Sequence, residues 1–320
     1  MSDVVTLGSA PGPVVRLLPF GATVQSLVVT GGDGVRRDVV LGHPSPTDYR
    51  GAPGYVGATI GRYANRIAGG RFELDGREVV VAAHDHGHSL HAGPDGFDQQ
   101  EWVVVHHDPH SASLRLVSPD GDRGFPGEVV ATAHVAVSEH ALAITYEATT
   151  DAPTVVAMTH HGYANLGDGE TIDDHLLTVP AASYTPADAD GIPTGRLEPV
   201  AGTAYDLRTP RGLGELRDLD HNFVVDGTGL RDVAVLDCPA TRTRLTVASD
   251  QPGLQVFTAG TFDGSGPPGL GRGAGVALEP QLFPDSPHHV GDPDWTDATL
   301  RPGQTFHARI VWTFSELAAR

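Results

Sequence analysis

The stretch EVVATAHVAV (128–137), followed closely by ALAITYEATT (141–150), decides the fold class of this chain. In both segments, β-branched and other apolar residues alternate with polar or small ones. This pattern is typical of a strand with one buried and one exposed face. The two segments therefore predict half-buried antiparallel strands.

Similar short runs continue in both directions along the chain. They are TVQSLVV (23–29), EVVVAA (78–83), EWVVVHH (101–107), SLRLVS (113–118), DVAVLD (232–237), TRLTVAS (243–249) and HARIVWTF (307–314). The 40 glycines and 25 prolines are spread between them, and only residues 211–219 offer a weak helical pattern. Many short strands separated by turns predict an all-β sandwich or barrel with few short helices. Without a repeat or a composition break, we expect a single domain over residues 1–320.

The composition excludes several chemistries. All 21 basic residues are arginine, so a Schiff-base or P-loop lysine is impossible. A net charge of −19 argues against a nucleic-acid surface. No run approaches the roughly 20 apolar residues of a membrane helix, and no signal peptide is evident, so we expect no membrane contact and a cytoplasmic location. The single cysteine, Cys238, excludes an internal disulfide and is interpreted as a small buried residue.

Two segments in the first third of the chain carry polar residues in unusual settings. GATIGRYANRIAGGRFELDG (57–76) places Asn65 and Arg66 in a glycine-rich turn, where a planar guanidinium can bind sugar hydroxyls or simply saturate loop carbonyls. In AAHDHGHSLHAGPDGF (82–97), His91 enters a turn. Three further histidines, His84, His86 and His88, would share one face if the segment were extended, which is a possible metal-ligand spacing.

Two later segments carry the strongest candidates for acid–base chemistry. In TVVAMTHHGYANLGDG (154–169), a β-branched strand delivers His160 and His161 to opposite faces, and the spacing does not choose between them. In GAGVALEPQLFPDSPHH (273–289), Glu279 ends an apolar run, so it is either a perturbed carboxylate or a strand-end residue that reaches solvent. Asp220, in LDHNFVVDG (219–227), is a weaker candidate that could merely cap a turn.

Together these segments resemble the aldose 1-epimerase (galactose mutarotase) family over nearly the whole chain. The resemblance is carried in order by GPVVRLLPFGATVQSLVV (12–29), YVGATIGRYANRIAGGRFELDG (55–76), SLHAG (89–93), THHGYANL (159–166), DHNF (220–223), QPGLQVFTAG (251–260) and ALEPQLFPD (277–285). It implies a large antiparallel β-sandwich, the galactose mutarotase-like supersandwich. It also implies an isomerase that interconverts the α and β anomers of free aldohexoses, with no metal and no cofactor.

The resemblance also implies a role for each matching residue. Glu279 would be the general base and His161, rather than His160, the general acid, assisted by His91. The residues that would bind the sugar hydroxyls are Asn65, Arg66, Asp220 and Gln255. A free sugar is neutral, which suits an acidic protein, and we expect a monomer or a homodimer.

The chain departs from the family pattern at four positions, and these departures bear on substrate preference. Alanine replaces a usual glycine at Ala92, and histidine replaces a usual asparagine at His84, His88 and His160. Three alternative functions remain at this point. A hexose-6-phosphate 1-epimerase would need Arg62, Arg66 and Arg71 to converge on a phosphate. A non-catalytic carbohydrate-binding β-sandwich and a metal-dependent enzyme built on His84, His86 and His88 are the others.

Overall fold

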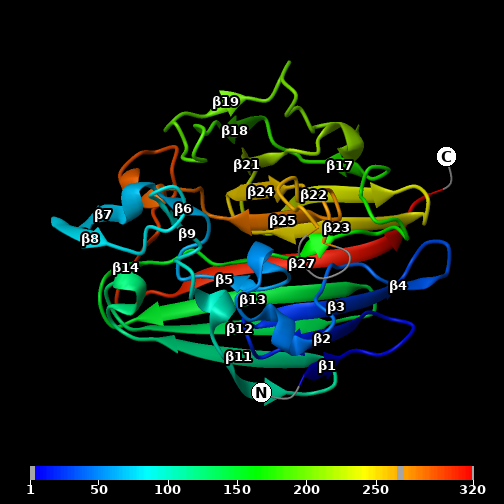
Figure 1. Cartoon of the computed structure of the whole chain (residues 1–320), viewed down its shortest axis with the longest axis horizontal. Coiled ribbons are helices and arrows are strands. Elements are labelled where there is room, and N and C mark those ends of the chain that lie inside the picture. The colour runs from blue at the N-terminus through cyan, green and yellow to red at the C-terminus, as the bar shows by residue number, and fades with distance from the viewer. Residues whose placement is uncertain (1–3, 265–269, 319–320) are drawn as a thin grey trace.

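A nine-stranded antiparallel sheet forms one layer of the protein in the computed structural model, which describes residues 4–264 and 270–318 (Figure 1). In spatial order its strands are β10 (Val103–His107), β11 (Ser111–Ser118), β12 (Val129–Val137), β13 (Ala141–Thr150), β27 (Phe306–Glu316), β23 (Thr243–Ser249), β22 (Arg231–Cys238), β17 (Leu176–Thr178) and β20 (Arg211–Gly212). The alternation of apolar and polar residues explains why these strands bury one face of the sheet: in β12 every second residue, from Val129 to Val137, is buried. The predicted half-buried strands at 128–137 and 141–150 are confirmed as neighbours in this sheet.

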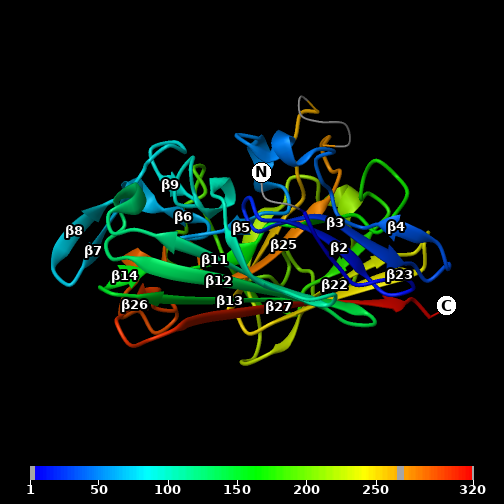
Figure 2. The ribbon, with the colours of Figure 1, turned by 90° about the horizontal axis from the view of Figure 1, so that it is seen from below.

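Two smaller sheets form the opposite layer. One has the order β1 (Val5–Leu7), β2 (Val14–Leu18), β3 (Thr23–Thr30), β4 (Arg36–Asp38). The other has the order β16 (Tyr163–Ala164), β25 (Val276–Gln281), β24 (Gly253–Phe257), β21 (Asp220–Val224), β18 (Ser183–Thr185), β19 (Glu198–Pro199). Figure 2 shows β2, β3, β4 and β25 above the layer of β11, β12, β13 and β27. The largest buried apolar cluster takes residues from both layers, so the predicted antiparallel β-sandwich is confirmed.

Short elements complete the described part of the chain. Four two-stranded pairs are β14 (Thr154–Val155) with β26 (Thr299–Leu300), β15 (Thr159–His160) with β5 (Thr59–Ile60), β6 (Arg66–Ile67) with β9 (Ser89–Leu90), and β7 (Arg71–Leu74) with β8 (Arg77–Val80). The helices of the described residues are all 3₁₀ turns: η1 (Pro46–Tyr49), η2 (Pro53–Tyr55), η3 (Ala68–Gly70), η4 (Phe97–Gln99), η5 (Asp122–Gly124), η6 (Leu213–Glu215) and η7 (Ser286–His288). None of these helices has the length and apolar character that crossing a membrane requires.

The sequence expectations were wrong in detail at two places. The helical pattern at 211–219 corresponds to β20 and the single turn η6, because Leu213 and Leu216 are buried by packing rather than by a helical stripe. The strand expected over 78–83 ends at Val80, where its pairing with β7 ends. The single-domain organisation over residues 1–320 stays a prediction.

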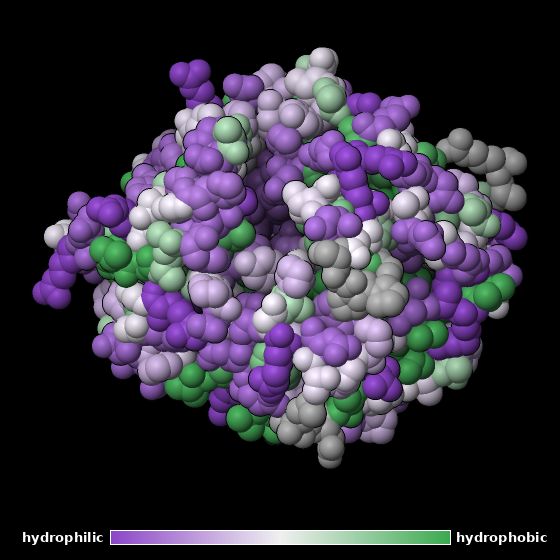
Figure 3. Space-filling view, in the orientation of Figure 1, coloured by the Kyte–Doolittle hydropathy of each residue, from purple (hydrophilic) through white to green (hydrophobic). Residues whose placement is uncertain are grey.

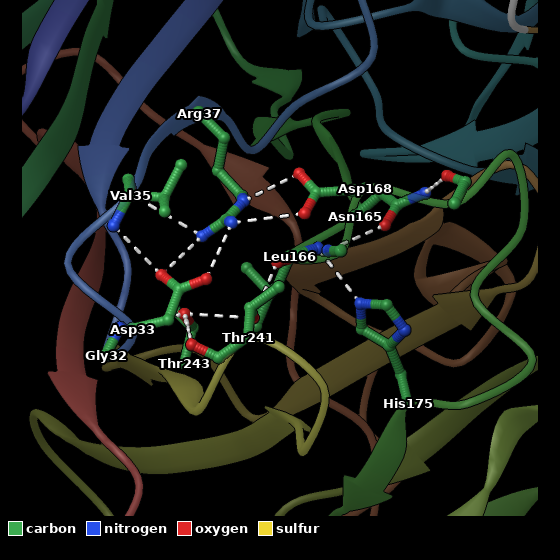
Figure 4. A network of polar contacts seen from close by, with 12 residues as sticks. Gly32, Asp33, Val35, Arg37, Asn165, Leu166, Asp168, His175, Thr241 and Thr243 are labelled. Carbon is green, nitrogen blue, oxygen red and sulfur yellow. Dashed lines mark hydrogen bonds and ion pairs between the residues drawn. The ribbon is translucent and has the colours of Figure 1, made fainter.

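A buried arginine of β4, Arg37, links the four-stranded sheet to a loop of the six-stranded sheet (Figure 4). Arg37 forms ion pairs with Asp33, in the turn before β4, and with Asp168, in the loop after β16. In that same loop, the Asn165 side chain donates hydrogen bonds to the carbonyls of Gly169 and Ala274. Ala274 lies just before β25, so these contacts hold the end of β16 and the start of β25 in a fixed relation.

Candidate active site

Three polar side chains lie together on one face of the six-stranded sheet. Gln255 of β24 is directly opposite Glu279 of β25, and Asp220 of β21 is opposite Phe257, two residues further along β24. Because side chains two residues apart in a strand point to the same face, all three polar side chains share that face. Gln255 Nε2 donates a hydrogen bond to Asp220 Oδ1 at 2.5 Å. Residues from three separate sequence motifs thus form one polar floor.

A histidine approaches the glutamate of this floor. His161 immediately follows β15, and its Nε2 lies 3.5 Å from Glu279 Oε2. The two side chains are only 6% and 2% exposed, so the glutamate is buried within β25 and does not reach bulk solvent. His160 instead packs its ring edge-on against Trp312, with ring centroids 5.7 Å apart. The structure therefore separates the two adjacent histidines by environment, and His161 is the one that faces Glu279.

A second histidine, His91, lies at right angles to His161, with ring centroids 5.4 Å apart. Its Nδ1 accepts a hydrogen bond from the backbone N–H of Asn65 at 3.0 Å. Asn65 has a positive φ of 64°, a conformation that asparagine tolerates better than most residues and that aims this N–H at the ring. Because Nδ1 is an acceptor, the proton of the neutral ring is on Nε2. His91 is thus prepared to donate a hydrogen bond into the site.

Burial controls the protonation of all three groups. It raises the pKa of Glu279 well above its ordinary value, with a further increase from nearby Asp220. It lowers the pKa of His161 to about 3, and it holds the pKa of His91 well below 6.5. The neutral forms, a carboxylic acid beside an imidazole, are therefore favoured in the closed environment. A His161–Glu279 pair that holds one proton meets the requirement for moving a proton between two sites on one ligand.

These groups open into a cavity of about 500 Å³, within the usual size range of small-molecule sites. Figure 3, in the orientation of Figure 1, shows a hollow in the surface of the molecule with hydrophilic residues around it. Its aromatic walls are Tyr55, Tyr163, Phe257 and Phe262. Sequence reasoning did not identify these four residues. Tyr55, Tyr163 and Phe257 lie within the motifs that carry the family resemblance. Tyr163 and Phe257 also lie on strands that adjoin β25, so strand register could have indicated them, whereas no sequence signal marks Phe262.

The candidate sugar-binding residues Asn65, Arg66, Asp220 and Gln255 all line this cavity, together with His91, His161 and Glu279. Three of these four sugar-binding candidates are already paired within the protein. Arg66 Nε donates to Asp85 Oδ2 at 2.8 Å, and Gln255 bonds to Asp220 as described. The Oε1 atom of Gln255 is buried without a protein partner. The walls therefore offer both donors and acceptors, as a polyhydroxylated ligand requires.

The three arginines needed for a phosphate site do not converge. Arg62 is 1% exposed, and its guanidinium donates to the carbonyls of Ser118, Pro126 and Gly127 at 2.8–3.0 Å. Arg71 is exposed and lies 3.6 Å from Glu78. Of the three, only Arg66 lines the cavity. The requirement for a hexose-6-phosphate enzyme is therefore not met by these three residues.

We expect Arg62→Lys to lower the free energy of unfolding by about 3 kcal/mol or more, because an ammonium group cannot reproduce the buried fork of hydrogen bonds. Urea denaturation would measure the loss. Arg71→Lys, at an exposed pair, is the matched control and should change stability by less than about 1 kcal/mol. An unchanged midpoint for Arg62→Lys would contradict this structural role.

The three clustered histidines do not form a shared ligand face. Residues 84–88 make a tight turn, in which the His84 N–H bonds to the His88 carbonyl and His86 has a φ of 50°. His88 Nδ1 accepts a hydrogen bond from the Gly69 N–H, while the His86 side chain is 72% exposed. The segment is therefore not extended, and the geometric condition for a metal site on His84, His86 and His88 is not met.

Another group of ligand-type residues, Asp174, His175 and Cys238, does lie close together, within 4.8 Å. His175 Nδ1 is 2.8 Å from Asp174 Oδ1, and its Nε2 accepts the backbone N–H of Leu166 (Figure 4). A metal on Nδ1 would force the ring proton onto Nε2, directly against that N–H. The group is therefore a hydrogen-bonded link between loops, and Cys238 is buried beside it as expected.

Fold and site together define a class: an all-β protein with a buried carboxyl–imidazole pair at the floor of a polar and aromatic small-molecule cavity. The family model described as aldose 1-epimerase matches residues 3–313. The chain therefore belongs to the aldose 1-epimerase family.

Individual relatives agree with this assignment. The chain is 37% identical to the aldose 1-epimerase of Escherichia coli (strain K12), with 97% of this chain and 94% of that protein covered. It is 35% identical to the galactose mutarotase of Homo sapiens, with 94% and 91% covered. Among solved structures, it resembles an aldose epimerase homologue from C. elegans (TM-score 0.94, 28% identity, 99% and 100% covered). It also resembles a galactose 1-epimerase from Lactobacillus acidophilus NCFM (TM-score 0.85, 28% identity, 98% and 94% covered).

Proposed function

We propose that this protein interconverts the α and β anomers of free aldohexoses such as glucose or galactose. The observation that carries the proposal is the 3.5 Å approach of His161 Nε2 to Glu279 Oε2 at the floor of a cavity with hydroxyl-binding walls. Relatives with more than 90% coverage are named aldose 1-epimerase and galactose mutarotase, which supports the same reaction. No cofactor is needed, because the reaction only moves protons and one C–O bond.

In the proposed mechanism, the ionised carboxylate of Glu279 takes the proton of the C1 hydroxyl. The C1–O5 bond breaks as the C1 oxygen forms the aldehyde, and His161, as imidazolium, gives its proton to the departing ring oxygen O5. Rotation about C1–C2 presents the other carbonyl face. The same two groups then run the steps in reverse, so every proton returns to its starting group.

The two required charge states arise from the single proton that the pair carries. Glutamic acid with neutral imidazole, and glutamate with imidazolium, contain the same number of protons. Burial favours the neutral arrangement, because it raises the pKa of Glu279 and lowers the pKa of His161. Sugar hydroxyls that hydrogen-bond to the carboxylate and to the imidazolium would stabilise the charged arrangement instead. Substrate binding can therefore prepare the acid and the base without a proton from solvent.

The other lining residues would hold the sugar in this orientation. The Nε2–H of His91 is suited to bond to O5 or the C1 oxygen while charge develops there. We propose that Arg66, Asp220 and Gln255 bind the remaining hydroxyls and that Asn65 acts mainly by orienting His91. Every one of these residues comes from the same chain. A monomer or a homodimer would therefore have complete sites, and the cytoplasm is the proposed location.

Polarimetry tests the proposed reaction. Freshly dissolved α-glucose or α-galactose should reach its equilibrium rotation faster in proportion to the protein concentration. A non-catalytic carbohydrate-binding protein would bind the sugar without changing this rate, and that result would overturn the proposal. A much higher kcat/KM for glucose-6-phosphate than for glucose would instead identify a phosphosugar enzyme.

We expect kcat/KM to remain flat across neutral pH and to fall on both sides. His161 with a lowered pKa stays neutral as the pH falls below 6.5, and Glu279 with a raised pKa keeps its proton as the pH rises above 4.5. Activity is lost in acid when a second proton joins the pair, and in alkali when the only proton leaves. Initial polarimetric rates, corrected for the spontaneous reaction, would measure the profile. An acid limb centred at pH 6.5, as for an exposed histidine, would contradict this account.

A further inference from the structure

An ion pair forms part of the cavity wall beside the acid–base residues. Arg66 Nε donates to Asp85 Oδ2 at 2.8 Å, and the two side chains are 18% and 20% exposed. On another side the guanidinium packs against Gly191, so closely that a β-carbon added to this glycine would lie 2.7 Å from Arg66 Nη1. Arg66 is therefore held in one orientation, and its charge is already matched inside the protein.

The rest of the cavity is acidic. Among its described lining residues are the carboxyl groups of Asp85, Asp220 and Asp263, besides Glu279, whose neutral form burial favours, against the single guanidinium of Arg66. An anionic ligand group would have to approach these carboxyl groups, and the one cation it could use among the described lining residues is paired to Asp85. Neutral hydroxyls meet no such penalty, because they donate to carboxylates and accept from the remaining N–H groups of Arg66.

We propose that Asp85 is a specificity-determining residue that makes the cavity reject anionic sugars, such as uronates and sugar phosphates, in favour of neutral aldoses. This inference rests on the proposed function and narrows its substrate class. Asp85 acts in two ways: it neutralises Arg66, and it adds a negative charge to the wall. Both effects oppose a ligand carboxylate or phosphate, and neither opposes a hydroxyl.

The substitution Asp85→Asn tests the charge of residue 85 separately from the orientation of the Arg66 guanidinium. The asparagine carbonyl can still accept the Arg66 Nε–H, so the guanidinium keeps its orientation, while one negative charge is removed. Glucose and glucuronate are the matched substrates, since a carboxylate replaces the C6 hydroxymethyl group in the second. We expect the kcat/KM ratio of glucuronate to glucose to rise about tenfold in Asp85→Asn at low salt, with a smaller rise at high salt.

Anomer exchange by NMR on equilibrated sugars would measure these ratios. Asp232→Asn, at an exposed position of β22 outside the cavity lining, makes the same change in net charge and should leave the ratio unchanged. Asp85→Ser, with a thermal unfolding check on both variants, guards against a folding defect. Equal loss of rate on both sugars in Asp85→Asn, or an equal shift of the ratio in Asp232→Asn, would overturn the proposal.

Failure of the inference is distinguishable from failure of the proposed function. If the wild-type protein does not accelerate glucose anomerisation at all, the proposed function fails. Equilibrium binding of glucuronate, measured by ligand NMR, then still tests the role of Asp85. Tighter binding to Asp85→Asn than to wild type supports the proposed rejection of anionic sugars by Asp85, and unchanged binding overturns it.

Discussion

Replacing Glu279 by glutamine should slow catalysed anomerisation by about 10³-fold while leaving sugar binding within a few fold of wild type. The glutamine amide keeps the shape of the side chain and can still hydrogen-bond to the C1 hydroxyl, but it cannot take a proton. Because Glu279 is 2% exposed and lies within β25, opposite Gln255 of β24, solvent has poor access to replace it as the base. The loss should therefore appear in kcat rather than in KM.

Glu147→Gln is the matched control, since Glu147 is an exposed residue of β13 and makes the same chemical change outside the cavity lining. Polarimetry on fresh α-glucose gives the rate, and ligand NMR gives the affinity. A Glu279→Gln protein with a rate near that of wild type would remove Glu279 from the mechanism. A loss of binding equal to the loss of rate would make it a binding residue only.

Substitution of the two adjacent histidines should have opposite consequences. His161→Asn should lower kcat by about 10²–10³-fold, because His161 is the group that lies beside Glu279 and can carry the shared proton to the ring oxygen. His160→Asn should leave the rate close to wild type. Neither ring nitrogen of His160 has a hydrogen-bond partner among the described residues, and burial alone lowers its pKa to about 4. It is a packing residue against Trp312.

The two variants control for each other, because they make the same substitution at neighbouring positions of comparable burial. Polarimetric rates and thermal unfolding should be measured on both. Equal rate losses at the two positions would show that a local packing defect, rather than loss of an acid, explains the effect. A larger loss for His160→Asn than for His161→Asn would contradict the assignment of the acid.

Much of the fold was predictable because its large sheet consists of long, half-buried strands. In β12 and β13 the apolar period of two residues coincides with the buried face, so local pattern and tertiary structure agree. In the two-residue strands, such as β5 and β15, there is no room for a period, and only long-range pairing defines them. The helix expected near 211–219 failed for a related reason: tertiary burial of Leu213 and Leu216 imitated a helical pattern.

The site was predictable to the extent that it depends on residue type in ordered motifs. Glu279 and His161 were identified by resemblance, and the strand register then explains why Glu279 meets the residues of β21 and β24. The orientation of His91 by the Asn65 N–H depends on a positive φ, which spacing does not reveal. The pairing of Arg66 with Asp85 joins residues 19 apart, and Asp85 lies in a turn that the sequence pattern did not predict.

Two-dimensional exchange NMR on an equilibrated mixture of α- and β-glucose tests the central claim most directly, because it observes anomer interconversion without any net reaction. The account predicts strong exchange cross-peaks between the α and β H1 signals with catalytic amounts of the wild-type protein, and only the spontaneous rate with Glu279→Gln. Cross-peaks no stronger with wild type than without protein, or equally strong with Glu279→Gln, would contradict it.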